Sequence, residues 1–249
     1  MKDIMIIAHR GASKEAPQNT MPAFIRACER GACGIETDAH ITGDGQVVLC
    51  HDYTVDKISD GTGKIRSMTL SELMRLDFGS AFSEKFKDTR IPTLDGFFEE
   101  VRRFGLRIIN VEIKPDKKNY REIVKETISA AKRHGVFGQM LISSFNAEIL
   151  REAKRVDPEC KTGLLYPYKN NAIACFFRAP LSKAKKIKAD AIHPHKSMVR
   201  RRIVKKAHRF GIKVNAWTVN SLKDARKLIN AGADGLITDL PGEMIAAFR

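Results

Sequence analysis

The stretch I-E-T-D-A-H-I-T-G-D-G-Q-V-V-L-C-H-D, from Ile35 to Asp52, predicts two strands joined by a tight turn. The turn falls at Gly43-Asp44-Gly45, where the Asp-Gly pair favours a hairpin because glycine tolerates the positive φ that such turns need. Alternate residues of a strand share a face, so Glu36 and Asp38 should point the same way. The second strand, from Gln46 to Cys50, is apolar enough to return along the first.

Two carboxylates and a histidine on neighbouring strands indicate a functional site. The second strand brings His51 to one end of the hairpin, and His40 shares the face of Asp38. A solvated strand face is the alternative explanation for any single acid. It is a poorer explanation for the group, because an inward-facing acidic pair is costly to bury unless it is paired or bound to a metal ion.

Strands and amphipathic helices alternate along the chain. The eight main strands that we predict are centred near Ile4, Ile35, Ile108, Leu141, Gly163, Ala191, Val214 and Gly235. This alternation favours an α/β protein with a parallel sheet, and eight repeats in 249 residues fit a (β/α)8 TIM barrel. An open doubly wound sheet is the alternative, but it would more often have about five to seven strands. The chain also lacks the G-x-G-x-x-G and Walker A loops typical of that fold.

Residues 53–92 interrupt the alternation. The segment contains a Gly-Thr-Gly turn and then the capping box Thr69-Leu70-Ser71-Glu72, which predicts a short helix. We interpret the segment as a small insertion after the hairpin of strand 2, followed by a helix from Leu94 to Phe104. The chain 1–249 would then form a single barrel domain. The insertion would emerge at the rim where the strands end and would form a cap there.

The composition is that of a globular protein in a reducing compartment. Hydrophobic residues make up 43% of the chain, which is enough for a sizeable core. No apolar run approaches the roughly 18 residues of a membrane helix, and the run from Ile4 to Ala8 is too short for a signal peptide. The five cysteines form no C-x-x-C pair, which argues against zinc and disulfides. We therefore expect a cytoplasmic protein without stable membrane insertion, and the sequence allows a homo-oligomer.

The net charge of +15 is concentrated between Lys183 and Lys213, where twelve lysines and arginines accompany one acid, Asp190. Nucleic acid, anionic lipid surfaces and anionic small molecules are all compatible with such a charge. Aromatic residues are few, and the basic residues follow helical spacing. A solvated helix face is therefore the favoured interpretation, with steering of an anionic substrate second, and we expect no nucleic acid partner.

The chemistry should lie at the C-terminal ends of the strands, as in barrel enzymes generally. These ends carry His9, Arg10, Glu36, Asp38, His51, Glu112, Lys114, Phe145, His193, His195 and Trp217. Three carboxylates suit a hard divalent cation, Mg²⁺ or Ca²⁺, better than zinc. Arginine and lysine suit a phosphate, and two histidines suit general acid and base roles near neutral pH. Together these residues predict cleavage of a phosphoester.

A set of ordered motifs resembles the glycerophosphodiester phosphodiesterase family over nearly the whole chain. They are H-R-G (9–11), A-P-Q-N-T (16–20), the hairpin (35–52), V-E-I-K (111–114), S-S-F-N (143–146), W-T-V-N (217–220) and T-D-L-P (238–241). The insertion adds T-L-S-E-L followed by L-D-F-G. The resemblance implies a TIM barrel that hydrolyses glycerophosphodiesters, with a divalent cation, to an alcohol and sn-glycerol 3-phosphate.

The resemblance also implies residue roles, carried over position by position. It implies His9 and His51 as the acid–base pair, Glu36, Asp38 and Glu112 as metal ligands, Arg10 and Lys114 as phosphate ligands, and Phe145 and Trp217 as the lining of the glycerol side.

One position departs from the family pattern. The family usually has Glu in P-E-N-T, where this chain has Gln18. Glutamine keeps the shape, loses a negative charge and can donate hydrogen bonds. We expect Gln18 and its neighbour Asn19 to support the site. Because the three main acids remain, we expect an active enzyme.

Three alternatives stay open at this point. A lysophospholipase D-like or phosphatidylinositol-type lipid phosphodiesterase would use the basic block and the insertion's Phe78, Phe82 and Phe86. A weakly active phosphate-binding member is suggested by Gln18. Nucleic-acid binding rests on charge alone. Among single residues, we expect Cys50 in the core, because adjacent strand residues face opposite ways. We expect His193 and His195 in a solvated loop, with contact to the substrate as the alternative.

Overall fold

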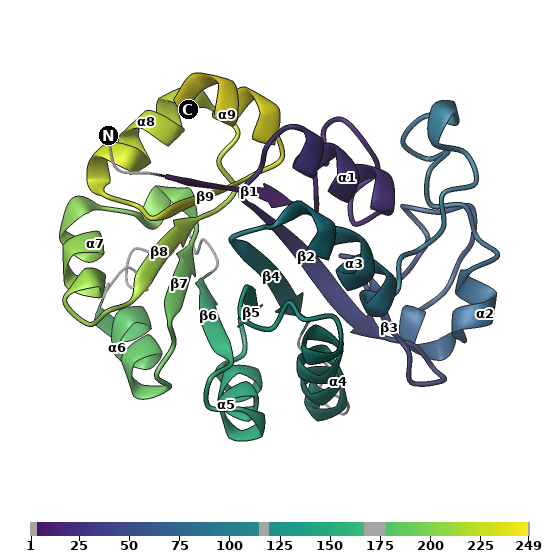
Figure 1. The fold of residues 1–249 in the computed structure, drawn as a ribbon, viewed down its shortest axis with the longest axis horizontal. Helices are drawn as coiled ribbons and strands as arrows, with labels where there is room; N and C mark the ends of the chain where they lie inside the picture. Colours follow the sequence, from purple (N-terminus) through teal and green to yellow (C-terminus); the bar gives the residue numbers. More distant parts are fainter. Residues whose placement is uncertain (1–3, 115–119, 167–177, 249) are drawn as a thin grey trace.

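Eight parallel strands close into a barrel in the computed structural model, which describes residues 4–114, 120–166 and 178–248 (Figure 1). The barrel strands in these ranges are β1 (Met5–His9), β2 (Gly34–Ile41), β4 (Ile108–Ile113), β5 (Met140–Ser144), β6 (Lys161–Tyr166), β7 (Ala191–Pro194), β8 (Lys213–Ala216) and β9 (Gly235–Thr238). Each strand pairs in parallel with the next, and β9 pairs with β1 to close the ring. The predicted TIM barrel is confirmed.

Helices follow the strands and cover the outside of the barrel (Figure 1). They are α1 (Met21–Glu29), α3 (Leu94–Val101), α4 (Tyr120–Arg133), α5 (Ala147–Val156), α6 (Arg178–Lys186), α7 (Arg201–His208), α8 (Leu222–Ala231) and α9 (Pro241–Phe248). Asn146 caps α5 by accepting a hydrogen bond from the Glu148 N–H at 3.0 Å, and Ser221 caps α8 in the same way. Such caps satisfy backbone donors that a helix leaves unpaired at its start.

The predicted hairpin prolongs β2 beyond the barrel. The short strand β3 (Val47–Leu49) pairs antiparallel with the last residues of β2, with His40 opposite Val48. Gly45 adopts φ +84° in the turn, a conformation that glycine allows without steric cost. Strand β2 runs to Ile41, because β3 pairs with its end.

Residues 53–92 pack against this hairpin around a small apolar cluster of their own. The buried members are Val48, Cys50, Val55, Ile65, Leu73, Phe78 and Ile91. The segment contains the short helix α2 (Leu70–Leu73) and the single 3₁₀ turns η1 (Ile65–Ser67) and η2 (Glu84–Phe86). At α2 the predicted capping box is present, because Thr69 and Glu72 each accept a hydrogen bond from the other's N–H. The expected core position of Cys50 is confirmed by its 1% exposure.

Four of the cysteines, Cys28, Cys33, Cys50 and Cys160, are free thiols, and Cys175 lies outside the described residues. Within the ranges that the structure covers, every helix is too short or too polar to cross a membrane.

His193 differs from the sequence expectation of a solvated loop. It lies on β7 with no exposed surface, and the amide of Asn215 donates to its Nε2 over 3.2 Å. A Cβ atom at Gly163 on β6 would lie only 2.8 Å from that nitrogen, so glycine there makes room for the ring. Inward-facing side chains fill the interior of a small barrel, and this imidazole is one of them. Burial lowers the pKa of His193 to about 4.

This burial predicts a stability that depends on pH. In the unfolded chain the pKa of His193 is about 6.5, well above the folded value. Above about pH 6.5 the neutral ring therefore makes its full contribution to the free energy of unfolding. As the pH drops towards 4, the titration of His193 lowers the free energy of unfolding by about 3 kcal/mol. His193→Gln should therefore lose less stability than wild type between pH 7 and pH 4, as measured by urea unfolding.

Leu141→Ala is the control for this measurement, because it removes buried apolar contacts but no titratable group. It should lower stability by a similar amount at both pH values. An unchanged pH dependence in His193→Gln would contradict the assignment.

Candidate active site

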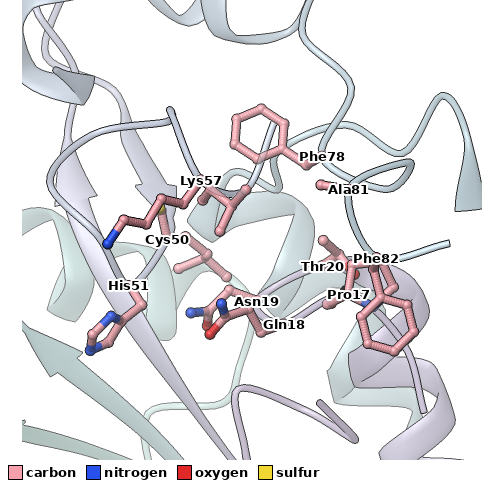
Figure 2. A pocket seen from close by; sticks show the side chains of 12 residues that line it. Pro17, Gln18, Asn19, Thr20, Cys50, His51, Lys57, Phe78, Ala81 and Phe82 are labelled. Carbon is pink, nitrogen blue, oxygen red and sulfur yellow. Dashed lines mark hydrogen bonds between the residues drawn. The ribbon is translucent and has the colours of Figure 1, made fainter. Parts of the chain in front are cut away.

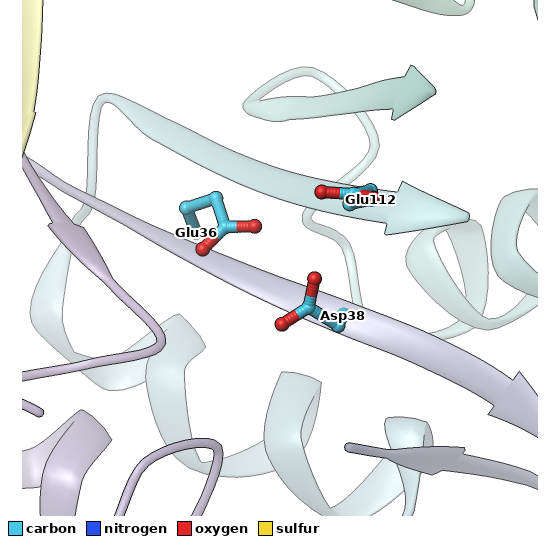
Figure 3. Close-up of side chains that lie close together, drawn as sticks. All are labelled: Glu36, Asp38 and Glu112. Carbon is cyan, nitrogen blue, oxygen red and sulfur yellow. The ribbon is translucent and has the colours of Figure 1, made fainter. Parts of the chain in front are cut away.

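Three acids converge at the C-terminal ends of β2 and β4 (Figure 3). Parallel pairing places Asp38 directly opposite Glu112, and Glu36 precedes Asp38 on the same face of β2. One carboxylate oxygen from each of the three residues lies within 4.8 Å of the others. All three side chains are buried, so the cluster is held inside the rim rather than on an open surface.

Lys114 bridges two of these acids. Its ammonium lies 2.7 Å from Asp38 Oδ1 and 2.8 Å from Glu112 Oε1. Burial alone would raise the pKa of Asp38, but Lys114 and then Arg10 lower it well below its usual range. Burial would likewise lower the pKa of Lys114, and the two acids raise it instead. Asp38 and Lys114 are therefore a charged pair at neutral pH.

The other two acids are less well compensated. Burial, followed by repulsion from Asp38, raises the pKa of Glu112 to about 7. Burial and repulsion from Asp38 and Glu112 also raise the pKa of Glu36 well above its usual range. The cluster thus holds more negative charge than its own cations offset. Three buried carboxylates in this state fit a hard divalent cation, which would relieve the repulsion between them.

The loop after β1 fits tightly against β2 and α1. Arg10 has a positive φ of 58°, and its N–H donates to both the carbonyl and the carboxylate of Glu36. The next residue, Gly11, also has a positive φ, and a Cβ there would lie 2.6 Å from the Ala23 carbonyl carbon. Glycine is therefore required in the H-R-G motif. A left-handed backbone at a non-glycine residue such as Arg10 is a feature often found at functional sites.

Asn19 fixes Asp38 from the opposite side. Its amide nitrogen donates to Asp38 Oδ2 at 2.8 Å, and its amide oxygen accepts from the Thr37 hydroxyl at 2.7 Å. Gln18 holds the guanidinium of Arg10 instead, accepting from Nη1 at 2.6 Å. Arg10 also lies 3.4 Å from Asp38 through Nε. Both predicted phosphate ligands, Arg10 and Lys114, are thus already in contact with acids of the cluster.

His9 lies between an acid of the cluster and a residue that the sequence analysis did not select. Its Nδ1 donates to Asp239 Oδ1 at 2.6 Å, and its Nε2 lies 3.9 Å from Glu36. Asp239 is in turn held by Asn220 and Ser13. The sequence could have indicated Asp239 as a site residue by its position in T-D-L-P, which follows the last strand and therefore lies at the same rim.

His51 has a similar arrangement at the end of the hairpin. Its Nδ1 lies 2.7 Å from Asp52 Oδ1, and it lines a cleft together with Glu112 and Lys114. Burial lowers the pKa of His51. His40 lies behind it, with Nε2 3.3 Å from the His51 carbonyl, and supports the end of the hairpin rather than the cleft.

Phe145 and Trp217 stand at the ends of β5 and β8. Their rings meet edge to face with centroids 5.8 Å apart, and Phe145 lines the same cleft as His51. The indole N–H of Trp217 donates to the His193 carbonyl at 2.6 Å, which fixes the ring at the rim. His195 packs edge-on against Trp217 and begins the 3₁₀ turn η5 (Lys196–Met198).

Comparison with known proteins agrees with this geometry. The profile of the glycerophosphoryl diester phosphodiesterase family matches residues 9–243. The chain belongs to this family. Family members hydrolyse glycerophosphodiesters, so the chain is a phosphoric diester hydrolase with the fold of the family.

Several relatives cover the chain almost completely. A glycerophosphodiester phosphodiesterase of Caldanaerobacter subterraneus subsp. tengcongensis is 39% identical over 98% of both chains. A phosphodiesterase of Oleispira antarctica, solved with its product sn-glycerol-3-phosphate, superposes with a TM-score of 0.87 at 31% identity, covering 98% of this chain and 96% of that one. A glycerophosphodiester phosphodiesterase structure from Thermotoga maritima gives 0.78 at 28% identity over 99% of both.

The departure at Gln18 predicts a modest effect of restoring the acid. Gln18→Glu adds one carboxylate beside Arg10 without touching the three-acid cluster, so kcat/KM should change by less than about tenfold. Steady-state hydrolysis of a glycerophosphodiester measures this. Gln46→Glu, the same substitution in the exposed hairpin turn, is the control. A rise of orders of magnitude would show instead that the native chain is a weakly active member of the family.

Proposed function

We propose that this protein hydrolyses glycerophosphodiesters to an alcohol and sn-glycerol 3-phosphate with the help of a divalent cation. The main support is the convergence of three buried acids with two histidines, each hydrogen-bonded to its own carboxylate, at one rim. The product bound to the Oleispira antarctica relative is consistent with this substrate class.

Glu36, Asp38 and Glu112 are the proposed ligands of the cation, which we propose is Mg²⁺ or Ca²⁺. A set of oxygen ligands suits these ions, and the cluster contains no thiol or imidazole that would favour zinc. When bound, the cation would supply positive charge next to the phosphate.

Lys114 and Arg10 are the proposed phosphate ligands. An ammonium has three donors, and two of those of Lys114 point at Asp38 and Glu112, which leaves one for a phosphate oxygen. The guanidinium of Arg10 has five donors and uses one on Gln18. Contacts with the three acids keep the side chains of Lys114 and Arg10 oriented before the substrate arrives. Binding therefore costs less side-chain entropy.

His9 and His51 are the proposed acid–base pair. One takes a proton from the attacking oxygen, and the other gives a proton to the oxygen of the leaving alcohol. Asp239 and Asp52 would keep each ring in one tautomer, because a carboxylate on Nδ1 holds the proton there and leaves Nε2 to act. Phe145 and Trp217 would cover the carbon atoms of the glycerol.

Residues 53–92 are proposed as a cap on one side of this single-domain barrel, since they pack on the hairpin that carries His51. A cytoplasmic location is proposed on the basis of the free thiols, which suit a reducing compartment.

Hydrolysis of a lipid is the second candidate function. Phe82 is 45% exposed on this cap and meets Phe86 edge to face, so an apolar group could rest there. Activity on lysophospholipid vesicles, with none on small diesters, would favour this candidate.

Removal of metal tests the proposed function most directly. Hydrolysis of glycerophosphoglycerol and glycerophosphoethanolamine should require added Mg²⁺ or Ca²⁺ and should stop with EDTA. His51→Ala should lower kcat by about 100-fold or more, because general acid or base catalysis is lost. His208→Ala, on the outer helix α7, is the matched control and should keep wild-type rates. Activity that survives EDTA would contradict the metal assignment.

Replacement of Asp239 tests the role of His9. Asp239→Asn keeps the shape but permits the wrong tautomer of His9, so kcat should fall by about 100-fold with little change in KM. Asp224→Asn at the start of α8, whose carboxylate pairs with Lys196, serves as the control. If Asp239→Asn lowers only the melting temperature and leaves kcat intact, Asp239 has a structural role.

A further inference from the structure

A second pocket adjoins the reaction cleft. It lies between the loop that carries Gln18 and the cap, with Phe78 and Phe82 on its far wall (Figure 2). Two residues, His51 and Lys57, line both this pocket and the cleft that contains Glu112 and Lys114. The pocket is therefore next to the place where the scissile phosphate is proposed to bind.

Position favours this pocket for the leaving alcohol. The glycerol half of the substrate is proposed to lie against Phe145, which lines the cleft but not the second pocket. The pocket opens past the other side of His51, one of the two groups proposed to transfer protons. The group attached to the phosphate opposite the glycerol would therefore extend towards it.

The lining of the pocket, as far as the structure describes it, carries positive charge only. Its described lining contains no aspartate or glutamate, and Lys57 is its only lysine or arginine. Lys57 forms no hydrogen bond or ion pair with any residue in the described ranges. Its ammonium end lies on the His51 side of the pocket, as Figure 2 shows. The two acids that line the cleft are already engaged, Asp52 by His51 at 2.7 Å and Glu112 by Lys114 at 2.8 Å.

Gln18 adds to this asymmetry. It lines the pocket as a neutral side chain. Its amide oxygen binds Arg10 without cancelling the charge of the guanidinium. A cationic group in the pocket would thus meet Lys57 with no carboxylate in the described lining to balance it.

We infer that this pocket binds the leaving alcohol and that Lys57 makes the enzyme prefer alcohols that carry a negative charge and discriminate against cationic ones such as choline. The inference rests on the proposed hydrolysis of glycerophosphodiesters and names the substrate class within it. Lys57 is exposed to solvent, so screening limits the effect. A difference of roughly fivefold in kcat/KM for each change of one charge is expected.

Three matched substrates test this inference. They are glycerol 3-phosphate diesters of choline, of 3,3-dimethylbutanol and of 3-hydroxypropanoate. The first two alcohols have the same shape and differ in one positive charge, and the third carries a negative charge. In wild type, kcat/KM should rise from choline to dimethylbutanol to hydroxypropanoate. Within each variant, rates are expressed relative to the neutral dimethylbutanol diester, so that general losses of activity cancel.

Charge reversal should invert the order. Lys57→Glu should favour the choline diester over the hydroxypropanoate diester, and Lys57→Met should bring both ratios towards one. Lys64→Glu is the matched control, because Lys64 is exposed on the same segment but lines neither pocket, and it should keep the wild-type order.

The possible failures are distinguishable. If wild type hydrolyses all three diesters and the ratios are the same in Lys57→Glu, the inference about Lys57 is overturned while the proposed function stands. If wild type hydrolyses none of them with Mg²⁺ or Ca²⁺ present, the proposed function fails and the inference fails with it.

Discussion

The structure depends on holding three carboxylates within 4.8 Å of each other inside a protein. Such a group repels itself and loses hydration, so it persists only where opposite charges are fixed beside it. Lys114 supplies one such charge from the position directly after β4, and Arg10 supplies another from the loop after β1. The amide of Asn19 adds a neutral donor to Asp38. The tight turn at Gly11 and the left-handed Arg10 are best understood as the backbone geometry that brings these donors to the acids.

The hairpin gives this arrangement a rigid support. Strand β2 pairs with β1 and β4 along its acidic part and with β3 at its far end. The cap packs on β3 through an apolar cluster that is separate from the barrel core. One continuous strand therefore carries two acids of the site, leads into the turn that returns to His51, and anchors one wall of the second pocket. A small change in the hairpin would move all of these together.

The sequence allowed the barrel and most of the rim to be predicted, because both follow from local rules. Strand and helix periodicity predicts the alternation, and alternation in a parallel barrel brings strand ends such as those at Asp38 and Glu112 together. Features that depend on contacts between distant segments were not accessible. The partnership of Asp239 with His9 requires β9 to pair with β1, and the burial of His193 requires the space left by Gly163 on the neighbouring strand. The direct contact of Lys114 with the acids could not be predicted from the sequence either.

The closure of the barrel by β1 and β9 also orders events during synthesis. A ribosome delivers His9 long before Asp239, and the two meet only when β9 pairs with β1. The acids of β2 and β4 emerge before β9, so a nascent chain would gather the three-acid cluster before His9 is held. A fragment stalled before β9 would keep the acids but lack the partner of His9. The hydrogen bond that orients His9 would thus form only after β9 has been made.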